Sequence, residues 1–387
     1  MKLFRSFSAG GSGNVLRDIL LVVAIFLLWR GALFGFDIVG MAMTEERNPN
    51  YNKDYQAFTV HSFWDSWARW DSGWYKRIVE RGYYNEGAQS NTAFFPLYPL
   101  AVKGVAKITR NHWVAGLVVS NLSLLFALFF MLGIARTCLD EEAARRSLVY
   151  LLIFPSSFFF SAYYTEALFL LTTTASFYFF LKERYFLCAV AGILATMTRS
   201  TGVALVGAFI IGYLWNKRFR ISQMSPAILW VLAIPLGIGA FMLILKYQMG
   251  DPLAFIKSQS GWGRGLLYPT ETVINTIKEI DFSLPRNWHN ADVFMNLLFT
   301  GLFMVVPFVM LGKADISLVI YSLFLVLIPL TTGSVLSMNR FCAVAFPAFL
   351  AFARLGTNRT ADRFMTFSFA ILLGLYSIQF ANWNWAG

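Results

Sequence analysis

The sequence predicts an all-α polytopic membrane protein with about eleven transmembrane helices. Composition supports this fold class, because 57% of the 387 residues are hydrophobic and only 14% are charged. Apolar runs also recur along the whole chain, each near the roughly 20 residues that a helix needs to cross the hydrocarbon core. No stretch is left for a separate soluble domain, so residues 1–387 are expected to form one membrane domain.

The apolar runs define the expected spans, several of which are short. Spans are expected at residues 17–41, 113–138, 147–163, 165–181, 186–198, 201–215, 226–247, 292–312, 315–332, 341–355 and 364–382. The short connections around Tyr164 and Arg199 indicate hairpins whose tips lie inside the membrane. Such tips are tolerated only where protein or water surrounds the exposed backbone.

Lys and Arg in the short connections give the expected orientation, because positive residues concentrate on the cytoplasmic side. They occupy the N-terminus and every second connection: Lys2, Arg5, Arg17, Arg145, Arg146, Lys182, Arg184, Lys217, Arg218, Arg220, Lys313, Arg354, Arg359 and Arg363. The N-terminus is therefore expected in the cytoplasm. The two long polar stretches, residues 42–112 and 248–291, then lie together on the extracytoplasmic side, and so does the C-terminus.

Net charge and cysteine usage argue against several other classes of protein. The formal net charge of +11 is spread over the inner connections, and no basic soluble domain is present to hold a nucleic acid. Anionic membrane lipids are the better partner for these charges. The three cysteines lie in or beside apolar spans without CxxC spacing, so neither a disulfide framework nor a zinc site is expected.

The first long polar stretch contains a dense cluster of aromatic and acidic residues, in the segment HSFWDSWARWDSGWYKRIVERGYY. On one helix, Trp67, Asp71 and Trp74 would share a face. Asp65 would lie four residues from Arg69, which makes an ion pair between them expected. One interpretation is an interfacial helix with its Trp residues at the headgroups. The other is that Asp71 is a general base made more basic by aromatic surroundings, with indole faces that bind a sugar.

A second amphipathic helix is expected later in the same stretch, in AFFPLYPLAVKGVAKITRNH. Its apolar and basic residues each recur at spacings of three and four, which makes two separate stripes. A span here would invert the charge bias of every later connection, so the helix is expected to lie in the membrane plane on the outer surface. Its basic stripe, Lys103, Lys107 and Arg110, attracts either a lipid phosphate or headgroups in general.

Charged residues at the expected hairpin tips need a partner or a function, because a charge within a span costs roughly 2.5 to 3.5 kcal/mol on insertion scales. Glu166, after SAYYT, either caps its hairpin or, with Tyr164, binds acceptor hydroxyls or orients Arg199. Arg199 interrupts LATMTRSTGVAL, and its guanidinium group is the leading candidate for binding a donor phosphate. Purely structural pairing of Arg199 with Glu166 or Asp71 is the alternative.

Arg340 is a second candidate for binding the phosphate. It lies in SVLSMNRF at the outer end of an expected span, with Asn339 beside it. Snorkelling of the Arg340 side chain to the lipid headgroups explains its position equally well.

The second long polar stretch carries GDPLAFIKSQSGWGRGLLYP. Asp251 followed by a proline is typical of a helix N-terminus, so its role is interpreted as structural. Gln259, Trp262 and Arg264 follow in a Gly-rich part that is able to move over the site, and Trp262 is a candidate for stacking on a sugar.

Five segments taken together resemble one known family. They are, in order, WARWDSGWYKRI, AFFPLYPLAVKGVAKI, FPSSFFFSAYYTEALFLL, ATMTRSTGVAL and SMNRFCAVAFPAFLAF. Their order and spacing resemble the mannosyltransferases of the type that adds the second mannose to GPI anchors, the PIG-V family, including its bacterial members. The likeness covers residues 15 to about 380.

The resemblance implies a GT-C fold and transfer of a hexose, expected to be mannose, from a polyprenyl or dolichyl phosphate to a hydroxyl of a glycolipid or other acceptor. Such families carry an acidic catalytic residue in the first outer loop, and this role falls on Asp71, with Asp65 as its competitor. Arg199 and Arg340 are the candidates for the donor phosphate. The candidates for sugar or acceptor binding are Asp65, Arg69, Trp70, Trp74, Tyr164, Glu166, Gln259, Trp262 and Asn339.

In the predicted mechanism, Asp71 removes the acceptor proton as the hydroxyl attacks the anomeric carbon, and a single displacement inverts the configuration. No DxD pair or His cluster indicates metal ligands, so neither a metal nor another cofactor is expected. A lipid flippase or solute transporter is the alternative, but it predicts inverted repeats that the sequence does not display. A structural scaffold is weaker still. The expected location is the bacterial plasma membrane, with the site on the extracytoplasmic face.

Overall fold

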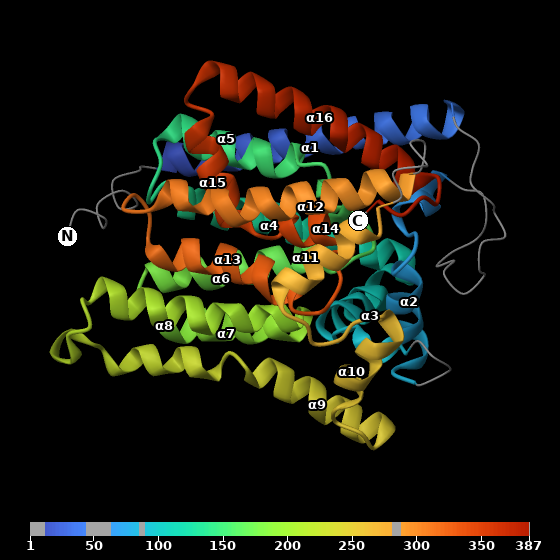
Figure 1. The fold of residues 1–387 in the computed structure, drawn as a ribbon, viewed down its shortest axis with the longest axis horizontal. Coiled ribbons are helices and arrows are strands. Elements are labelled where there is room, and N and C mark those ends of the chain that lie inside the picture. Colours follow the sequence, from blue (N-terminus) through green and yellow to red (C-terminus); the bar gives the residue numbers. More distant parts are fainter. Residues whose placement is uncertain (1–11, 44–62, 85–89, 281–287, 387) are drawn as a thin grey trace.

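The computed structural model describes residues 12–43, 63–84, 90–280 and 288–386. These residues form α-helices joined by short 3-10 helices and turns, with no strand among them, which confirms the all-α class. In Figure 1 most of the long helices run side by side along one axis as a bundle. Helix α1 begins at the left-hand end of this bundle, and α16 ends at the right-hand end.

Two groups of helices make up the bundle and the cap at one of its ends. The bundle contains α1 (Ser12–Met43), α4 (His112–Ala135), α5 (Glu141–Ile153), α6 (Glu166–Leu181), α7 (Tyr185–Thr198), α8 (Ala204–Asn216), α9 (Leu236–Met249), α12 (Trp288–Val305), α13 (Ile316–Leu330), α14 (Met338–Ala343), α15 (Phe346–Leu355) and α16 (Arg359–Ala381). The cap contains α2 (Ser72–Arg81), α3 (Leu97–Thr109), α10 (Ala254–Lys257) and α11 (Pro269–Lys278).

The length and hydropathy of the helices indicate an integral membrane protein. Five helical stretches are long and apolar enough to cross a membrane: Val15–Met43, His112–Ala135, Pro226–Met249, His289–Met310 and Arg359–Ala381. Five more apolar helices are shorter: Glu166–Leu181, Tyr185–Thr198, Ser200–Asn216, Ile316–Leu330 and Phe346–Leu355. Helix α5 opens with charged residues and belongs to neither group, so the count of eleven spans stays a prediction.

Proline residues divide several of the expected spans. The expected span 147–163 is α5 followed by a 3-10 turn, and Pro155 lies between the two. The expected span 226–247 is likewise a 3-10 helix and then α9, with Pro235 at the junction. Pro347 lies at the start of α15, just after the break from α14. A proline interrupts a helix because it lacks the backbone N–H and its ring clashes with the preceding turn.

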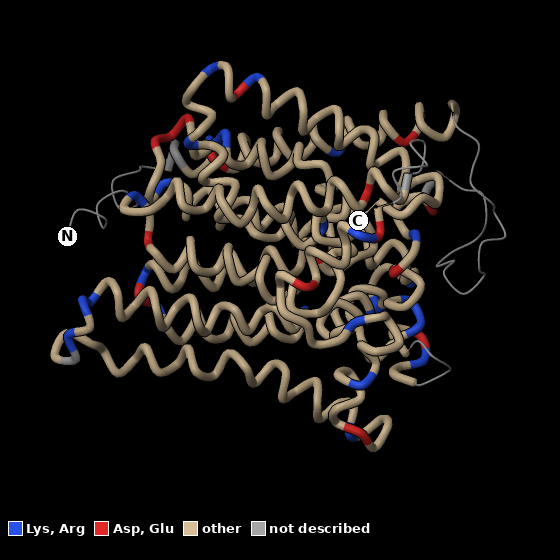
Figure 2. The backbone as a smooth tube through the Cα atoms, viewed as in Figure 1, with Lys and Arg blue, Asp and Glu red and all other residues tan. Residues whose placement is uncertain are grey.

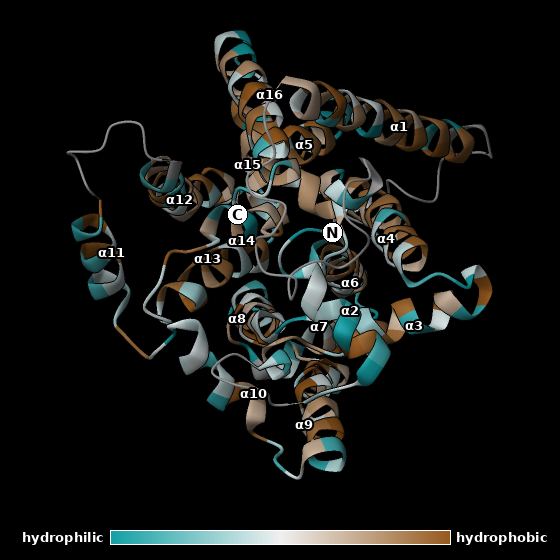
Figure 3. Ribbon diagram, turned by 90° about the vertical axis from the view of Figure 1, so that its right-hand side faces the viewer, coloured by the Kyte–Doolittle hydropathy of each residue, from teal (hydrophilic) through white to brown (hydrophobic). Residues whose placement is uncertain are grey.

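The two long polar stretches meet at the cap, as the sequence predicts. The Thr92 hydroxyl donates to the Ala254 carbonyl at 3.3 Å, and the Tyr83 N–H donates to Gln248 Oε1 at 2.9 Å. Figure 3 looks onto this end, where the mainly hydrophilic α2 lies among hydrophobic helices. Lys, Arg, Asp and Glu gather mainly towards the two ends of the bundle, as Figure 2 shows, which is the distribution that a membrane imposes.

The first polar stretch differs from the expected continuous helix. A 3-10 helix, Phe63–Trp67, is followed by a break, and α2 begins only at Ser72. Trp70 has a φ of 55°, a left-handed conformation that an α-helix excludes. The prediction that Trp67, Asp71 and Trp74 share one helical face is therefore wrong.

Candidate functional site

A cavity of about 560 Å³ lies where the cap meets the bundle, and it is within the size range of small-molecule sites. Its wall comes from the break before α2, the start of α6, the α7–α8 connection, the second polar stretch and α14. The Asp, Glu, Lys and Arg residues of this wall are Asp71, Glu166, Arg199, Arg264 and Arg340. Five charged groups around one cavity at the end of a membrane bundle mark it as the candidate functional site.

Four of these groups form one continuous chain of ion pairs. Arg340 Nη1 lies 2.9 Å from Asp71 Oδ2, and Arg340 Nε lies 3.3 Å from Glu166 Oε1. The same Glu166 oxygen lies 2.7 Å from Arg199 Nη1. Glu166 is 1% exposed, so its charge is compensated by both guanidinium groups rather than by water. Glu166 thus joins Arg199 to Arg340, a contact that fits both the predicted orienting role of Glu166 and the alternative of purely structural pairing.

The carboxylate of Asp71 faces the cavity instead of capping its own helix. Asp71 occupies the N-cap position of α2, where an Asp side chain commonly accepts a backbone N–H of the first turn. No such bond is made here, and the carboxylate pairs with Arg340. Indole rings line the same cavity as Asp71, as expected, but an arginine from a distant helix, Arg340, also reaches its carboxylate.

Tyr164 fixes the turn that presents Asp71. Its hydroxyl accepts the Asp71 backbone N–H at 3.1 Å and donates to the Arg69 carbonyl at 3.0 Å. The Arg69 carbonyl precedes Trp70 and the Asp71 N–H follows it. The two hydrogen bonds therefore stabilise the left-handed backbone conformation of Trp70. Tyr164 is fully buried behind the turn, so it positions the cavity wall and is not part of it.

Aromatic residues from three parts of the chain complete the wall. Trp70 packs edge-on against Trp385, with ring centroids 5.7 Å apart. Trp262, on the second polar stretch, packs edge-on against Phe94 at 5.6 Å. Trp385 brings the C-terminal segment to the same end as both polar stretches, in agreement with the predicted topology.

Asp65 occupies a different environment from Asp71. Its carboxylate forms the expected ion pair with Arg69, at 2.8 Å, and both side chains are buried. The Arg69 guanidinium group also lies over the Trp383 ring, 4.4 Å from its centroid. This pair is absent from the described cavity wall and stabilises the segment behind Trp70. The geometry therefore favours Asp71 over Asp65 as the group that can meet a ligand.

The structure brings seven of the twelve predicted site residues to the cavity. Those in its wall are Trp70, Asp71, Glu166, Arg199, Gln259, Trp262 and Arg340. Those outside the described wall are Asp65, Arg69, Trp74, Tyr164 and Asn339. Of the second group, Tyr164 is hydrogen-bonded to Asp71 and Trp74 packs edge-on against Trp262, so these two support the wall directly.

Asp292 and Asn296 are supporting residues that the sequence analysis did not identify. Asn296 Oδ1 accepts the backbone N–H of Asn339 at 2.8 Å, directly before Arg340. Asn296 Nδ2 donates to Asp292 Oδ2 at 3.0 Å, which fixes which way the amide points. The Ser156 hydroxyl donates to the Asn339 carbonyl at 2.9 Å. These bonds hold the first turn of α14 and so determine the position of Arg340. The feature of the sequence that could have identified this pair is an Asp residue within an apolar run.

Asn296→Ala is expected to lower kcat about 10-fold, because the buried Asn339 N–H loses its acceptor and Arg340 loses its fixed position. Steady-state kinetics checks this. The double variant with Asp292→Asn and Asn296→Asp exchanges the two groups, so an acceptor for Asn339 and a donor between the two side chains are both kept. It should recover most of the activity. A double variant as slow as Asn296→Ala would argue against positioning by this pair.

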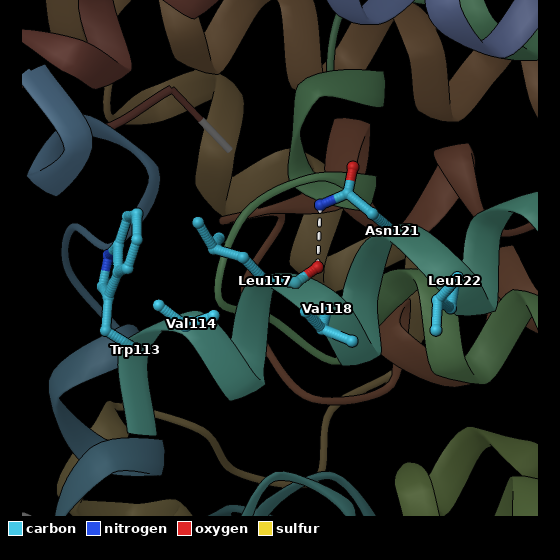
Figure 4. A pocket seen from close by; sticks show the side chains of 6 residues that line it. All are labelled: Trp113, Val114, Leu117, Val118, Asn121 and Leu122. Atoms are coloured by element: carbon cyan, nitrogen blue, oxygen red, sulfur yellow. Dashed lines mark hydrogen bonds between the residues drawn. The ribbon is translucent and has the colours of Figure 1, made fainter. Parts of the chain in front are cut away.

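A second hollow lies on the surface of α4 and carries no chemistry. It is lined by Trp113, Val114, Leu117, Val118, Asn121 and Leu122, as Figure 4 shows. The one amide among them, Asn121 Nδ2, donates to the Leu117 carbonyl of the same helix at 2.8 Å. No ionisable group lines it, so acid–base or phosphate chemistry is assigned to the cavity at the cap alone.

Comparisons with known proteins agree with the fold. The model of the family described as Mannosyltransferase (PIG-V) matches residues 15–236, a range that contains Asp71, Glu166 and Arg199. The crystal structure of ArnT from Cupriavidus metallidurans bound to undecaprenyl phosphate aligns with a TM-score of 0.54 at 14% identity. This alignment covers 94% of the present chain and 64% of ArnT. The apo structure of the same ArnT gives a TM-score of 0.53 at 16% identity, covering 89% and 60%.

The chain therefore spans less than two thirds of the length of these structures. No curated protein matches the sequence. At this level of identity, the likeness to ArnT is a likeness of fold, and that fold is GT-C.

Proposed function

Because this chain belongs to the PIG-V mannosyltransferase family, we propose that it is a membrane glycosyltransferase that transfers one mannose residue from a polyprenyl phosphate to a hydroxyl group. The acceptor is a glycolipid or another glycan. The bound undecaprenyl phosphate of ArnT, which shares the fold, supports a donor of this class. The observation that carries the proposal is the cavity wall in which Asp71, Arg340, Glu166 and Arg199 form one chain of ion pairs.

In this proposal Asp71 is the general base. The acceptor hydroxyl gives its proton to the Asp71 carboxylate while its oxygen bonds to the anomeric carbon. The bond from that carbon to the phosphate oxygen breaks, and its electron pair stays on the phosphate. One displacement inverts the anomeric configuration, so a β-linked donor gives an α-linked product.

The guanidinium groups of Arg199 and Arg340 face the leaving group in this proposal. Negative charge on the phosphate increases as the glycosidic bond breaks, so fixed cations there stabilise the transition state more than the bound donor. Trp70, Trp262 and Gln259 line the same cavity and supply ring faces and an amide for the sugar.

We further propose that the chain forms one GT-C domain in the bacterial plasma membrane, with the N-terminus in the cytoplasm and the cavity on the extracytoplasmic face. The positive-inside pattern supports this orientation, because both long polar stretches lie at the cavity end. A flippase or transporter is less favoured, because membership of a glycosyltransferase family and a carboxylate facing the cavity both support an enzyme.

Radiolabelled polyprenyl-phosphate mannose tests the proposed function directly. Purified protein in lipid nanodiscs is offered this donor with candidate glycolipid acceptors, and the polyprenyl-phosphate glucose analogue is run in parallel. We expect mannose transfer to at least one acceptor and less transfer of glucose. Failure of the wild-type protein to bind or consume any polyprenyl-linked sugar would reject the proposal.

Removal of divalent metal ions is expected to leave the transfer rate unchanged. The two carboxylates of the cavity, Asp71 and Glu166, are each paired with arginine, and the nearby guanidinium groups repel a divalent cation. The measurement is the transfer rate after dialysis against EDTA, with and without added Mg²⁺ or Mn²⁺. A loss in EDTA that either ion restores would contradict this expectation.

A further inference from the structure

The charges of the cavity wall do not balance. The wall holds two carboxylates, Asp71 and Glu166, and three guanidinium groups, those of Arg199, Arg264 and Arg340. The carboxylates are each within ion-pair distance of Arg199 or Arg340. With all five groups ionised, one positive charge remains without a partner. An enclosed site with one excess positive charge favours a ligand with one negative charge.

Arg264 is the arginine that carries this excess. Within the described parts of the chain, no carboxylate oxygen lies within 4.0 Å of its guanidinium group. Its one side-chain hydrogen bond is from Nη1 to the neutral Gln259 Oε1, at a long 3.3 Å. The charges of Arg199 and Arg340 are each compensated by a carboxylate, whereas the charge of Arg264 is not.

The surroundings of Arg264 make its charge costly in the absence of an anion. Burial lowers the pKa of its guanidinium group and the nearby positive charges of Arg340 and Arg199 lower it further, while the Asp71 carboxylate offsets part of this shift. A cation held close to two others gains more than an isolated one from a bound anion. This electrostatic arrangement is that of an anion-binding site rather than of a surface ion pair.

The backbone around Arg264 is held against the end of α13. The Gly265 N–H donates to the Thr332 carbonyl and the Leu267 N–H to the Thr331 carbonyl, both at 3.0 Å. Gly263 has a φ of +67°, which a side chain would disfavour, and it turns the chain just before Arg264. The turn at Gly263 and the two backbone hydrogen bonds to the end of α13 therefore hold the Arg264 guanidinium group at the cavity.

Resting on the proposed function, we infer that Arg264 binds the phosphate of the incoming donor while Arg340 stays paired with Asp71. A sugar-linked polyprenyl phosphate is a phosphodiester and carries a single negative charge, which matches the single unbalanced positive charge of the cavity. In this scheme Arg264 is a binding residue for the donor, and Arg199 remains with Glu166.

The same balance holds after transfer. The proton from the acceptor neutralises Asp71, so Arg340 loses its carboxylate partner as the glycosidic bond breaks. The leaving polyprenyl phosphate is now a monoester with up to two negative charges. Three guanidinium groups against the Glu166 carboxylate leave two positive charges, so Arg340 can turn to the phosphate when the second charge develops.

Binding of polyprenyl-phosphate mannose, a phosphodiester, in the absence of any acceptor tests Arg264 without requiring turnover. Protein in zwitterionic nanodiscs is titrated with this lipid, and binding is measured by native mass spectrometry or calorimetry. Arg264→Gln is expected to weaken binding about 10- to 100-fold, because it removes a charge-assisted contact to phosphate. Arg264→Lys keeps the charge and should stay within a few-fold of wild type. Lys257→Gln, on the same loop but exposed and paired with Asp251 outside the cavity, is the matched control and should bind normally.

A second variant keeps the inference testable if Arg264→Gln does not fold. Gln259→Glu is nearly isosteric and puts a carboxylate beside the Arg264 guanidinium group, so it should also weaken binding. Normal binding by both Arg264→Gln and Gln259→Glu would overturn the inference while leaving the proposed function intact. No binding by wild type would instead reject the proposed function. Displacement of the lipid by equal concentrations of inorganic phosphate or phosphatidylglycerol would assign Arg264 to a free anion or a headgroup, and would also overturn the inference.

Discussion

Asp71→Asn is expected to lower kcat by about 10²- to 10⁴-fold, the usual contribution of a general base, without loss of polyprenyl phosphate binding. Asparagine has nearly the same size as aspartate, so the turn held by Tyr164 should persist. The amide cannot accept the acceptor proton, and the reaction loses its base. Single-turnover transfer with saturating donor gives kcat, and a parallel binding titration shows whether the donor site is intact.

Two other aspartates serve as controls for Asp71. Asp251→Asn changes an exposed carboxylate outside the cavity and should transfer at the wild-type rate. Asp65→Asn breaks a buried ion pair with Arg69 and should lower thermal stability, because the guanidinium group keeps its charge without its partner. Normal transfer by Asp71→Asn, together with loss of transfer by a stably folded Asp65→Asn, would move the base to Asp65.

Hydrophobic patterning was enough to place the helices, because the membrane solvent imposes the same length and polarity on every span. The runs around Tyr164 and Arg199 were correctly expected as short hairpins, and α6, α7 and α8 have those lengths. The occurrence of Lys and Arg in every second connection predicted that both polar stretches lie at the same end. The count of eleven spans stays a prediction, since α5 carries charges in its first turns and its apolar part is short.

The break before α2 was not predictable from local pattern. Helical spacing favours a continuous helix through Trp67 and Trp74, and Trp70 has no intrinsic preference for a left-handed conformation. Tyr164, more than ninety residues later, bonds both peptide groups beside Trp70 and selects the turn. Tertiary contacts of this kind override local propensity, and only the structure shows them.

Candidate site residues were predictable by type but not by pairing. A charge within an apolar run pointed to Glu166, Arg199 and Arg340, because such charges are costly unless they have a partner or a function. The sequence left open which of them would meet. The structure pairs Arg340 with Asp71, 269 residues away along the chain, and the role of Arg264 depends on those pairings.

Arg340→Gln is expected to lower kcat by about 10²- to 10³-fold, because a cation that stabilises the charge on the leaving phosphate is lost. It should also lower the free energy of unfolding by about 3–5 kcal/mol, since the Asp71 and Glu166 carboxylates lose a shared partner in a buried site. Arg340→Lys keeps the charge but cannot contact both carboxylates through two guanidinium nitrogens. Its kcat and its free energy of unfolding should therefore lie between those of the wild type and of Arg340→Gln. Transfer kinetics and thermal melting in the same nanodiscs check both effects.

The double variant Asp71→Asn with Arg340→Gln separates catalysis from folding. If the two residues act as one unit, in which protonation of Asp71 releases Arg340 to the phosphate, the double variant should lose no more activity than the slower single variant. Its thermal stability should exceed that of Arg340→Gln, because the unpaired Asp71 charge is gone. Fully multiplicative losses in kcat would mean that base and cation act independently, and would rule out the exchange of partners by Arg340.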